Sequence, residues 1–315
     1  MLTRAPAGTD SPAADPVTGP RRRTGASAAR RSVVGLAFVA PTAAIVAALF
    51  LVPLGILVYM SFTDWPLLGS PTVNGVENYR QLGSDDRFLG AIKFTIVYTL
   101  ITTVVLFAAA FVLVAISNSP RRGTLFYRTA FFLPYVVGTA AASSMWWIDA
   151  NDQLGVFNHA LQTTGLVDQP VGLLATPTKA LLTVIALVVW KFVGFQLMVL
   201  LVGLQSIPAQ LYEAARVDGA STWQRLRYIT VPSLRPTLAL LTVLSVTGSL
   251  LAFDQFFVLT HGGPDNSTVT VVLALYNKAF QSFRLGSAAA EAVVVLVVLV
   301  LVNVIQLRLL REREK

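Results

Sequence analysis

Six long apolar runs limit what this chain can fold into. They cover approximately residues 33–60, 91–117, 129–149, 179–206, 237–260 and 287–307. Each is long enough to cross the hydrocarbon core of a bilayer, which takes roughly 20 apolar residues in a helix. Transmembrane barrel strands alternate in polarity and span only about 10 residues, unlike these continuous runs. Because only helices and closed barrels satisfy their backbone polar groups in lipid, the sequence predicts an all-α polytopic membrane protein with six transmembrane helices.

Basic residues are distributed unevenly between the predicted loops. If the N-terminus is cytoplasmic, seventeen Lys and Arg residues lie in segments on the cytoplasmic side and four lie in external loops. Short cytoplasmic loops of membrane proteins carry such an excess. We therefore expect a multi-pass protein of the cell membrane, in contact with lipid and with both termini in the cytoplasm. This distribution also accounts for the net charge of +8 without a nucleic-acid partner.

Three segments are expected along the chain. Residues 1–32 are rich in Ala, Pro, Gly, Thr and Arg, which predicts a disordered basic tail. A cleavable signal peptide is the alternative, but its apolar core would be about 7–15 residues long, and the run from Val33 to Met60 is longer. A retained anchor is therefore favoured. The membrane domain is predicted over 33–310, with a charged cytoplasmic C-terminus at 311–315.

The composition argues against chemistry carried by this chain. It contains no Cys and only two His, His159 and His261, both in predicted loops. A cysteine- or histidine-ligated metal centre is therefore not expected, nor is a cofactor. The phosphate-loop pattern G-x-x-x-x-G-K-[ST] is also absent, because none of the five Lys follows a Gly. We expect a protein that is not an enzyme and does not itself bind ATP.

A charged segment at 207–236 separates the fourth and fifth apolar runs. Pro208 suits the first turn of a helix, and Gly219 suits a left-handed helix end. Ser221 and Gln224 have the spacing of a capping box that opens a second helix. The sequence predicts helix, bend and helix, with Asp218 either capping the second helix or meeting a cation. A surface hairpin without any partner remains an alternative interpretation.

The hairpin sequence "EAARVDGASTWQRLRYITVPSLRP" resembles the EAA loop of ABC importer permeases. Leu226 stands where that family usually has Phe, and it is still bulky and apolar. Further stretches resemble the carbohydrate-uptake branch, of the maltose and glycerol-phosphate type: "SFTDW", "GVENYRQL", "GLQSIP" and "FDQFFVLTHGGPDNST". The matching positions of the EAA pattern are Glu213, Ala214, Ala215, Asp218, Gly219, Ala220, Ile229 and Pro232.

The resemblance implies a six-span permease subunit with the fold of type I ABC importers. In that family the EAA loop docks on a cytoplasmic ATPase. The implied partners are a second permease subunit, two copies of the ATPase, an external solute-binding protein and a sugar. A non-sugar solute such as glycerol-phosphate is the alternative. The implied ATPase-coupling residues are Glu213, Ala214, Ala215, Asp218, Gly219, Ala220, Leu226 and Pro232.

Polar residues inside the predicted spans are candidates for the solute pathway. Lys191 lies deep in the fourth run, and an ionisable group at such a depth suggests function by default. It is expected either to pair with Asp254 of the fifth run or to contact solute. Asn303 and Gln196 line the pathway or bond between helices. Glu291 lies near the outer end of the sixth run, where we expect it to be in water.

Two other classes of protein compete with this interpretation. A self-sufficient secondary transporter would need relay groups for protons or sodium in its spans, and such groups are sparse here. An integral-membrane enzyme would need a cluster of His or acidic residues at one membrane face, and the sequence contains no such cluster.

Overall fold

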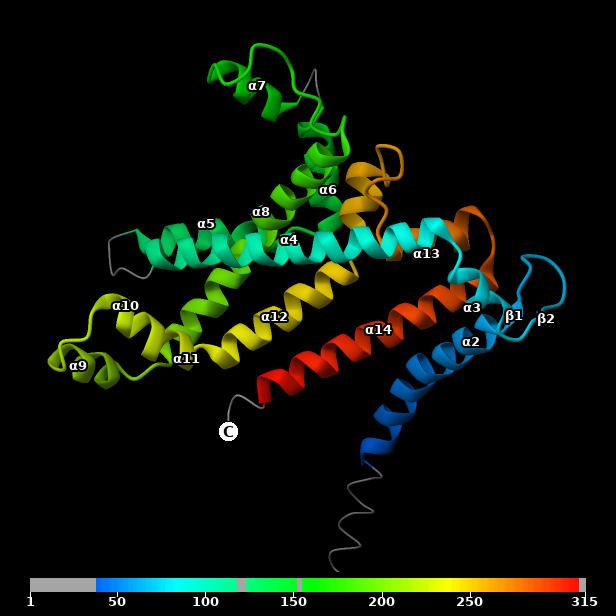
Figure 1. Cartoon of the computed structure of the whole chain (residues 1–315), viewed down its shortest axis with the longest axis horizontal. Helices are drawn as coiled ribbons and strands as arrows, with labels where there is room; N and C mark the ends of the chain where they lie inside the picture. The colour runs from blue at the N-terminus through cyan, green and yellow to red at the C-terminus, as the bar shows by residue number, and fades with distance from the viewer. Residues whose placement is uncertain (1–37, 118–122, 152–154, 312–315) are drawn as a thin grey trace, which may run out of the picture. The chain divides into compact units, whose positions relative to one another are not determined.

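The computed structural model describes residues 38–117, 123–151 and 155–311. The chain divides into two compact units, Met1–Gly55 and Ile56–Lys315. In the first unit a helix begins at Phe38 and continues beyond the unit boundary to Ser61 (Figure 1). This helix includes the π-helical turn η1 (Ala47–Leu51) and ends as α2 (Val52–Ser61). The tail predicted at 1–32 lies outside the described residues, as does the C-terminal segment predicted at 311–315 apart from Arg311, which ends the last helix.

Three further helices have the length and hydropathy of membrane spans. They contain the predicted second, fourth and sixth spans, and are α4 (Asp86–Ser117), α8 (Pro177–Gln205) and α14 (Leu285–Arg311). By length and composition, the described residues hold four spans, or six if each of two bent helix pairs is counted as one. The mostly helical membrane architecture is therefore confirmed, whereas two of the expected straight helices are not.

The first bent pair replaces the straight helix predicted over 129–149. Helices α5 (Thr124–Val136) and α6 (Thr139–Asp149) meet at an angle of 98°. Val137 and Gly138 between them have extended backbones, with ψ near 134° and 142°. Pro134 lies in the last turn of α5, where its ring disfavours a continuing helix. The chain therefore turns sharply within the third apolar run.

The fifth apolar run is also interrupted. Helix α12 (Arg235–Leu250) ends well before residue 260, and the chain resumes helical form after a break, in a turn that includes η3 (Phe256–Thr260). The carbonyl of Ala252 in the break accepts a hydrogen bond of 2.8 Å from the Thr270 hydroxyl. A backbone group freed by the break is thus satisfied by a distant side chain, as a buried carbonyl requires.

Helix α8 is the internal helix of the second unit. Of its most apolar stretch 61% is buried, against 28% for α4 and 22% for α14. Helices α4, α5 and α12 pack against it (Figure 1). A helix that is apolar on all sides is suited to such a position. Two buried clusters form around it, one containing Tyr98, Val184, Leu187, Phe256 and Leu259, the other Leu106, Ala110, Leu197, Leu200 and Leu241.

The loops between the spans carry short elements. Two of them are the short helices α3 (Glu77–Leu82) and α7 (Val156–Thr163). A two-stranded antiparallel sheet, which the sequence did not predict, pairs β1 (Thr63–Asp64) with β2 (Thr72–Val73). The buried Asn78 side chain fixes α3 by donating bonds of 2.9 Å to the carbonyls of Ser61 and Thr63. The last loop contains α13 (Val271–Tyr276) and η4 (Asn277–Gln281).

Candidate functional site

The charged segment folds as the predicted helical hairpin. Helix α9 (Ala209–Val217) is followed by α10 (Thr222–Arg225), which continues through η2 (Leu226–Thr230) and α11 (Val231–Ser233). Gly219 has a φ of 74°, the left-handed conformation expected of a glycine after a helix. Its amide donates to the carbonyl of Arg216 at 3.1 Å, and the next amide donates to that of Ala215 at 2.8 Å.

The second helix begins with the predicted capping box. The amide of Ser221 donates to Gln224 Oε1 at 2.7 Å, and the amide of Gln224 donates to Ser221 Oγ at 3.3 Å. Ser221 therefore caps this helix and Asp218 does not. Within the described ranges the Asp218 side chain has no hydrogen-bond or ion-pair partner. The hydroxyls of Tyr212 and Thr230 lie 2.9 Å apart and tie the two helices together.

The predicted ATPase-coupling residues lie on the surface of this hairpin. Glu213 and Arg216 form an ion pair of 3.9 Å in which both side chains are more than half exposed, so the pair contributes little to stability. The exposed members are Glu213, Ala214, Asp218, Gly219 and Leu226, and the half-buried ones are Ala215, Ala220 and Pro232. Their coupling role stays a prediction.

Large apolar side chains accompany the charges on the hairpin. Val217 is 88% exposed, Tyr228 70% and Trp223 67%. Aromatic residues are enriched at protein interfaces, where they supply much of the binding energy. The hairpin thus combines charged and apolar groups on a surface that contacts little of its own chain.

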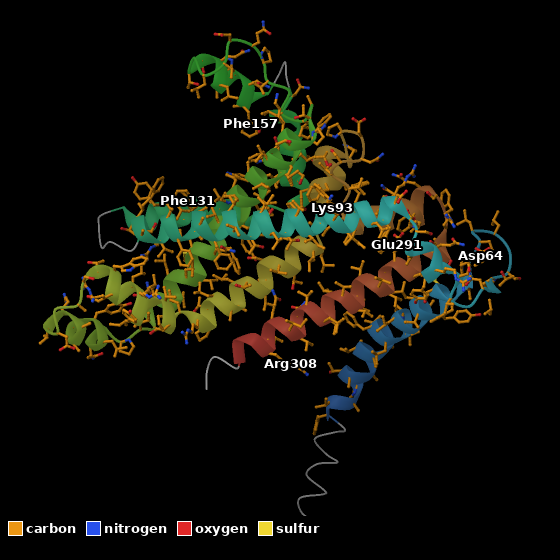
Figure 2. The ribbon with its side chains drawn as sticks, in the orientation of Figure 1. Asp64, Lys93, Phe131, Phe157, Glu291 and Arg308 are labelled. Atoms are coloured by element: carbon orange, nitrogen blue, oxygen red, sulfur yellow. The ribbon has the colours of Figure 1, made fainter. Side chains whose placement is uncertain are left out.

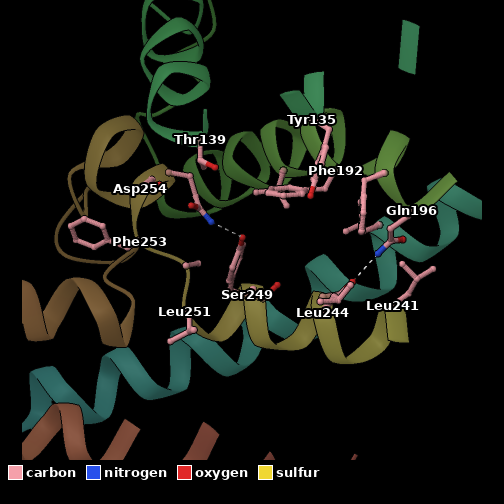
Figure 3. A pocket seen from close by; sticks show the side chains of 18 residues that line it. Tyr135, Thr139, Phe192, Gln196, Leu241, Leu244, Ser249, Leu251, Phe253 and Asp254 are labelled. Atoms are coloured by element: carbon pink, nitrogen blue, oxygen red, sulfur yellow. Dashed lines mark hydrogen bonds between the residues drawn. The ribbon is translucent and has the colours of Figure 1, made fainter. Parts of the chain in front are cut away.

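A cavity of about 440 Å³ opens where the spans break (Figure 3). The rings of Tyr135 and Phe195 stack at 4.7 Å on one side of it, next to Phe192. The cavity draws on α4, α5, α6, α8, α12 and the break after α12. Its lining comprises Tyr98, Leu106, Tyr135, Thr139, Val188, Phe192, Phe195, Gln196, Leu241, Leu244, Ser245, Gly248, Ser249, Leu251, Ala252, Phe253, Asp254 and Gln255.

Polar groups are interspersed among the aromatic rings of the cavity. Gln196 Nε2 donates to Ser245 Oγ at 2.7 Å, and Gln255 Nε2 donates to the Tyr98 hydroxyl at 3.2 Å (Figure 3). Asp254 is exposed, and its carboxylate has no partner in the part of the chain that the structure describes. The cavity can therefore accept and donate hydrogen bonds while offering flat apolar faces.

Lys191 does not pair with Asp254 as predicted. Its side chain is buried, and Nζ donates to the carbonyl of Tyr135 at 3.3 Å and to the carbonyl of Val137. These carbonyls are available because α5 ends at Val136. The ammonium group also lies 5.2 Å from the Phe192 ring centroid and 6.0 Å from that of Tyr135. Lys191 therefore bonds to the carbonyls that the break in the third span leaves available, and not to the carboxylate of Asp254.

Asn303 bonds between helices. Its Oδ1 accepts a bond of 3.1 Å from the Thr247 hydroxyl on α12, and its Nδ2 donates to the carbonyl of Leu299 at 2.8 Å. It is not among the residues that line the cavity. Of the predicted pathway candidates, Asp254 and Gln196 lie in the cavity lining, whereas Lys191 and Asn303 do not. The pathway role of all four stays a prediction.

The expectation that Glu291 lies in water is wrong. Its side chain, on α14 (Figure 2), is fully buried and forms an ion pair with Lys278. Lys278 also bonds to Asp85 Oδ2 at 2.6 Å. Burial raises the pKa of Asp85, but the bonds from Lys278 and from two backbone amides more than offset this and lower it. Burial lowers the pKa of Lys278, but the two carboxylates outweigh this effect and raise it. The first turns of α14 are covered by α3 and η4, which the sequence did not indicate.

Several polar residues that line the cavity were not predicted from the sequence. Ser245 and Ser249 are four apart in α12 and so share one helix face. Tyr135 and Thr139 flank the Pro134 and Gly138 that mark the break in the third run. Both signals are present in the sequence, but each also fits ordinary helix packing.

The comparison with known families decides what kind of protein this is. The sequence pattern of the family described as "binding-protein-dependent transport system inner membrane component" matches residues 123–315, which is more than half of the chain. The chain belongs to this family. Its members are membrane components of transport systems, which agrees with the helical architecture. The matched residues include the hairpin, both broken spans and the cavity lining except Tyr98 and Leu106 of α4.

Curated permeases resemble the chain over most of its length. The probable ABC transporter permease YesP of Bacillus subtilis is 32% identical over 87% of this chain and 89% of its own length. The multiple sugar-binding transport system permease MsmF of Streptococcus mutans is 33% identical over 81% and 88%. The lactose transport system permease LacF of Rhizobium radiobacter is 32% identical over 90% and 95%.

Solved structures support the same fold. A chain of a bacterial ABC transporter involved in the import of the acidic polysaccharide alginate superposes with a TM-score of 0.80 at 24% identity, covering 93% of this chain and all of that one. A second structure of a bacterial alginate transporter, in complex with a pentasaccharide-bound periplasmic protein, gives 0.75. At this identity the likeness establishes the permease fold alone.

Proposed function

We propose that this chain is a membrane-spanning permease subunit of an ATP-driven sugar importer. It forms half of the translocation pathway and couples to a cytoplasmic ATPase through the hairpin 207–236. One observation carries the proposal: the second helix of the exposed hairpin, Thr222–Ser233, passes through a 65° bend into α12, and α12 lines the cavity. A surface suited to a partner and a surface suited to a solute thus lie on two consecutive helices joined by a single bend.

The chemistry of the cavity supports a sugar as the solute. Sugars combine apolar ring faces with hydroxyl groups, and the cavity offers the rings of Tyr135, Phe192 and Phe195 beside hydroxyl and amide groups. Three of the similar permeases are named for sugars or starch products, among them MsmF and LacF. Relatives named for sn-glycerol-3-phosphate also match, but the unpartnered carboxylate of Asp254 opposes an anionic solute. We therefore favour a neutral sugar.

The assembly follows from the family and from the charge distribution. We infer a heterodimer with a second permease subunit, two copies of an ATPase and an external solute-binding protein, without nucleic acid. The excess of basic residues in alternate loops supports a cell-membrane protein with both termini and the hairpin in the cytoplasm. The chain itself is not an enzyme in this scheme, because ATP is hydrolysed by the partner.

Substitutions in the hairpin test the coupling role. Gly219→Val places a β-branched side chain at a φ of 74°, where a Cβ meets no atom within 4 Å. It therefore strains the hairpin and alters its docking surface without disturbing the neighbouring spans. We expect the variant to insert normally, to lose copurifying ATPase and to lose sugar uptake. Glu213→Ala should weaken ATPase recruitment in the same assay.

Gly75→Val is a matched control for the hairpin variant. Gly75 has a φ of 64° and also has no atom within 4 Å of a Cβ, but it lies in the first external loop. The Gly75→Val variant should keep the ATPase bound. If Gly219→Val and Glu213→Ala both retain the ATPase as tightly as the wild type and transport normally, the hairpin is not the coupling element and the surface-hairpin interpretation holds.

Cysteine labelling tests the orientation. Because the chain contains no Cys, single substitutions report side-specific access. Asn74→Cys, Gln162→Cys and Asp265→Cys should react with an impermeant thiol reagent in intact cells, and Thr222→Cys should react only after the membrane is opened. Labelling of Thr222→Cys from outside would contradict both the orientation and the ATPase docking.

A further inference from the structure

A side chain from another helix bonds to the backbone at the bend between α5 and α6. Lys191, in the middle of α8, is 3% exposed, and its ammonium group donates to the carbonyls of Tyr135 and Val137 on either side of the end of α5. The last carbonyls of a helix lack partners within the helix and carry a partial negative charge. Lys191 supplies both a hydrogen-bond donor and the complementary charge at that point.

The packing around Lys191 fixes the position of α5 on α8. One turn further along α8, a Cβ at Gly194 would overlap the backbone carbonyl of Phe131, so the two backbones are in close contact there. The Lys191 ammonium also lies over the face of Phe192 and near that of Tyr135, an arrangement that attracts a cation to an aromatic ring. Close approach at Gly194 and the cation at Lys191 together set where α5 ends.

Residues next to Lys191 line the cavity. Tyr135, Thr139 and Phe192 line the 440 Å³ cavity, and the same three residues line an adjoining hollow of about 540 Å³ that also contains Lys191. Lys191 is absent from the lining of the first cavity. Lys191 therefore lies on the side of Tyr135, Thr139 and Phe192 that faces away from the first cavity. From there it contacts the two aromatic rings and the backbone of the bend.

We propose that Lys191 is a positioning residue for solute selection: it holds the bend between α5 and α6 and thereby sets the placement of Tyr135 and Phe192 in the cavity. This inference rests on the proposed function, in which the cavity contacts the solute. Lys191 acts through its two backbone acceptors and the two rings, and it does not touch the solute.

The bend itself is measured with a pair of spin labels on the full chain in its assembled complex. Thr129→Cys and Ser144→Cys lie on exposed positions of α5 and α6. With a rise of 1.5 Å per residue, these backbone positions are about 14 Å apart across a right-angled bend and about 22 Å apart along a straight helix. Adding Lys191→Met should broaden the distance distribution toward the longer value, and Lys191→Arg should restore the narrow one.

Solute selection is measured on the same variants after reconstitution with the copurified ATPase and binding protein. The probes are radiolabelled maltose, lactose and raffinose, supplied at saturating binding protein. The readout is the ratio of uptake rates for the two sugars that the wild type transports fastest. Lys191→Met should change this ratio about tenfold, the size of one altered contact in an apolar pocket, and Lys191→Arg should recover it.

Lys179→Met is the matched control. Lys179 lies on the same helix, its side chain is exposed, and it belongs to neither of these two cavities. It should leave the distance distribution and the uptake ratio unchanged. A uniform loss of uptake for all sugars, without rescue by Arg, would indicate a merely structural Lys191 and overturn the proposal.

The positioning role of Lys191 and the solute-contact role of the cavity are overturned by different results. A Lys191→Met protein with an unchanged distance distribution overturns the positioning role, even if Tyr135→Ala alters sugar selection and so supports the cavity. A broadened distribution with an unchanged uptake ratio in both Lys191→Met and Tyr135→Ala overturns the cavity as the solute surface. A wild-type complex that imports none of the three sugars but imports sn-glycerol-3-phosphate overturns the sugar assignment.

Discussion

The hairpin and the cavity are held together in different ways. In the hairpin the bonds that define the turn join residues three to five apart, as in the capping box of Ser221 and Gln224. Around the cavity the bonds join distant residues: Gln196 to Ser245, 49 positions on, and Gln255 to Tyr98, 157 positions away. A change in the hairpin should therefore stay local, whereas a change in the membrane part should be felt throughout its packing.

The largest expected effect comes from removing Lys278, which pairs with both Glu291 and Asp85. Lys278→Met removes the partner of the fully buried Glu291, and breaking a buried pair in this way costs roughly 3–5 kcal/mol. The midpoint of thermal unfolding in detergent should fall clearly. Lys93→Met is the control, because Lys93 is exposed on α4 (Figure 2). Adding Glu291→Gln to Lys278→Met should recover most of the loss; an unchanged midpoint in Lys278→Met would show that the pair stabilises nothing.

A second substitution tests the close contact between α5 and α8. Gly194→Ala forces the carbonyl of Phe131 away, and such overpacking costs about 1–3 kcal/mol. The same substitution at Gly90 in α4, where a Cβ meets no atom within 4 Å, should stabilise by up to about 1 kcal/mol through helix propensity. Opposite shifts of the unfolding midpoint are expected. Equal shifts would mean that the two helices are not in contact as described.

In the hairpin, the corresponding change should remain local. Ser221→Ala removes a helix cap, which costs about 1 kcal/mol. Amide hydrogen exchange should accelerate in residues 221–230, while the unfolding midpoint of the membrane part stays constant. Ser233→Ala serves as the control, because its hydroxyl has no partner in the described part of the chain. A fall in the global midpoint on Ser221→Ala would remove the distinction between the two regions.

The smallest expected effect is a pH dependence of the membrane part. The folded pKa of Asp85 is lowered, so its contribution to stability is present above the unfolded value of about 3.9 and is lost as pH falls below it. The pKa of Lys278 is raised, so its contribution is present below about 10.4 and is lost at higher pH. The unfolding midpoint should be level between about pH 5 and 9 and fall on both sides. Asp85→Asn should reduce the acid-side fall; an identical fall would contradict the assignment.

The difference between short-range bonds in the hairpin and long-range bonds in the membrane part also explains which features could be predicted from the sequence. The hairpin was predicted residue by residue, because Gly219 and Ser221 act through backbone groups within a few positions. The long spans α4, α8 and α14 followed from their length and hydropathy. The breaks after Val136 and Leu250 were not predicted, because the groups that satisfy them come from Lys191 and Thr270. Glu291 was misplaced for the same reason: its burial depends on Lys278 and α3.

The junction between the hairpin and α12 has a mechanical consequence. Helix α12 is 16 residues long, so it extends about 24 Å from the 65° bend to the break at Leu251. A rigid rod of this length that tilts by about 5° at one end moves by about 2 Å at the other. A small rotation of the hairpin, carried rigidly by α12, would therefore displace the end of this helix at Leu250 by a distance comparable to an atomic diameter, four positions before the cavity-lining Asp254.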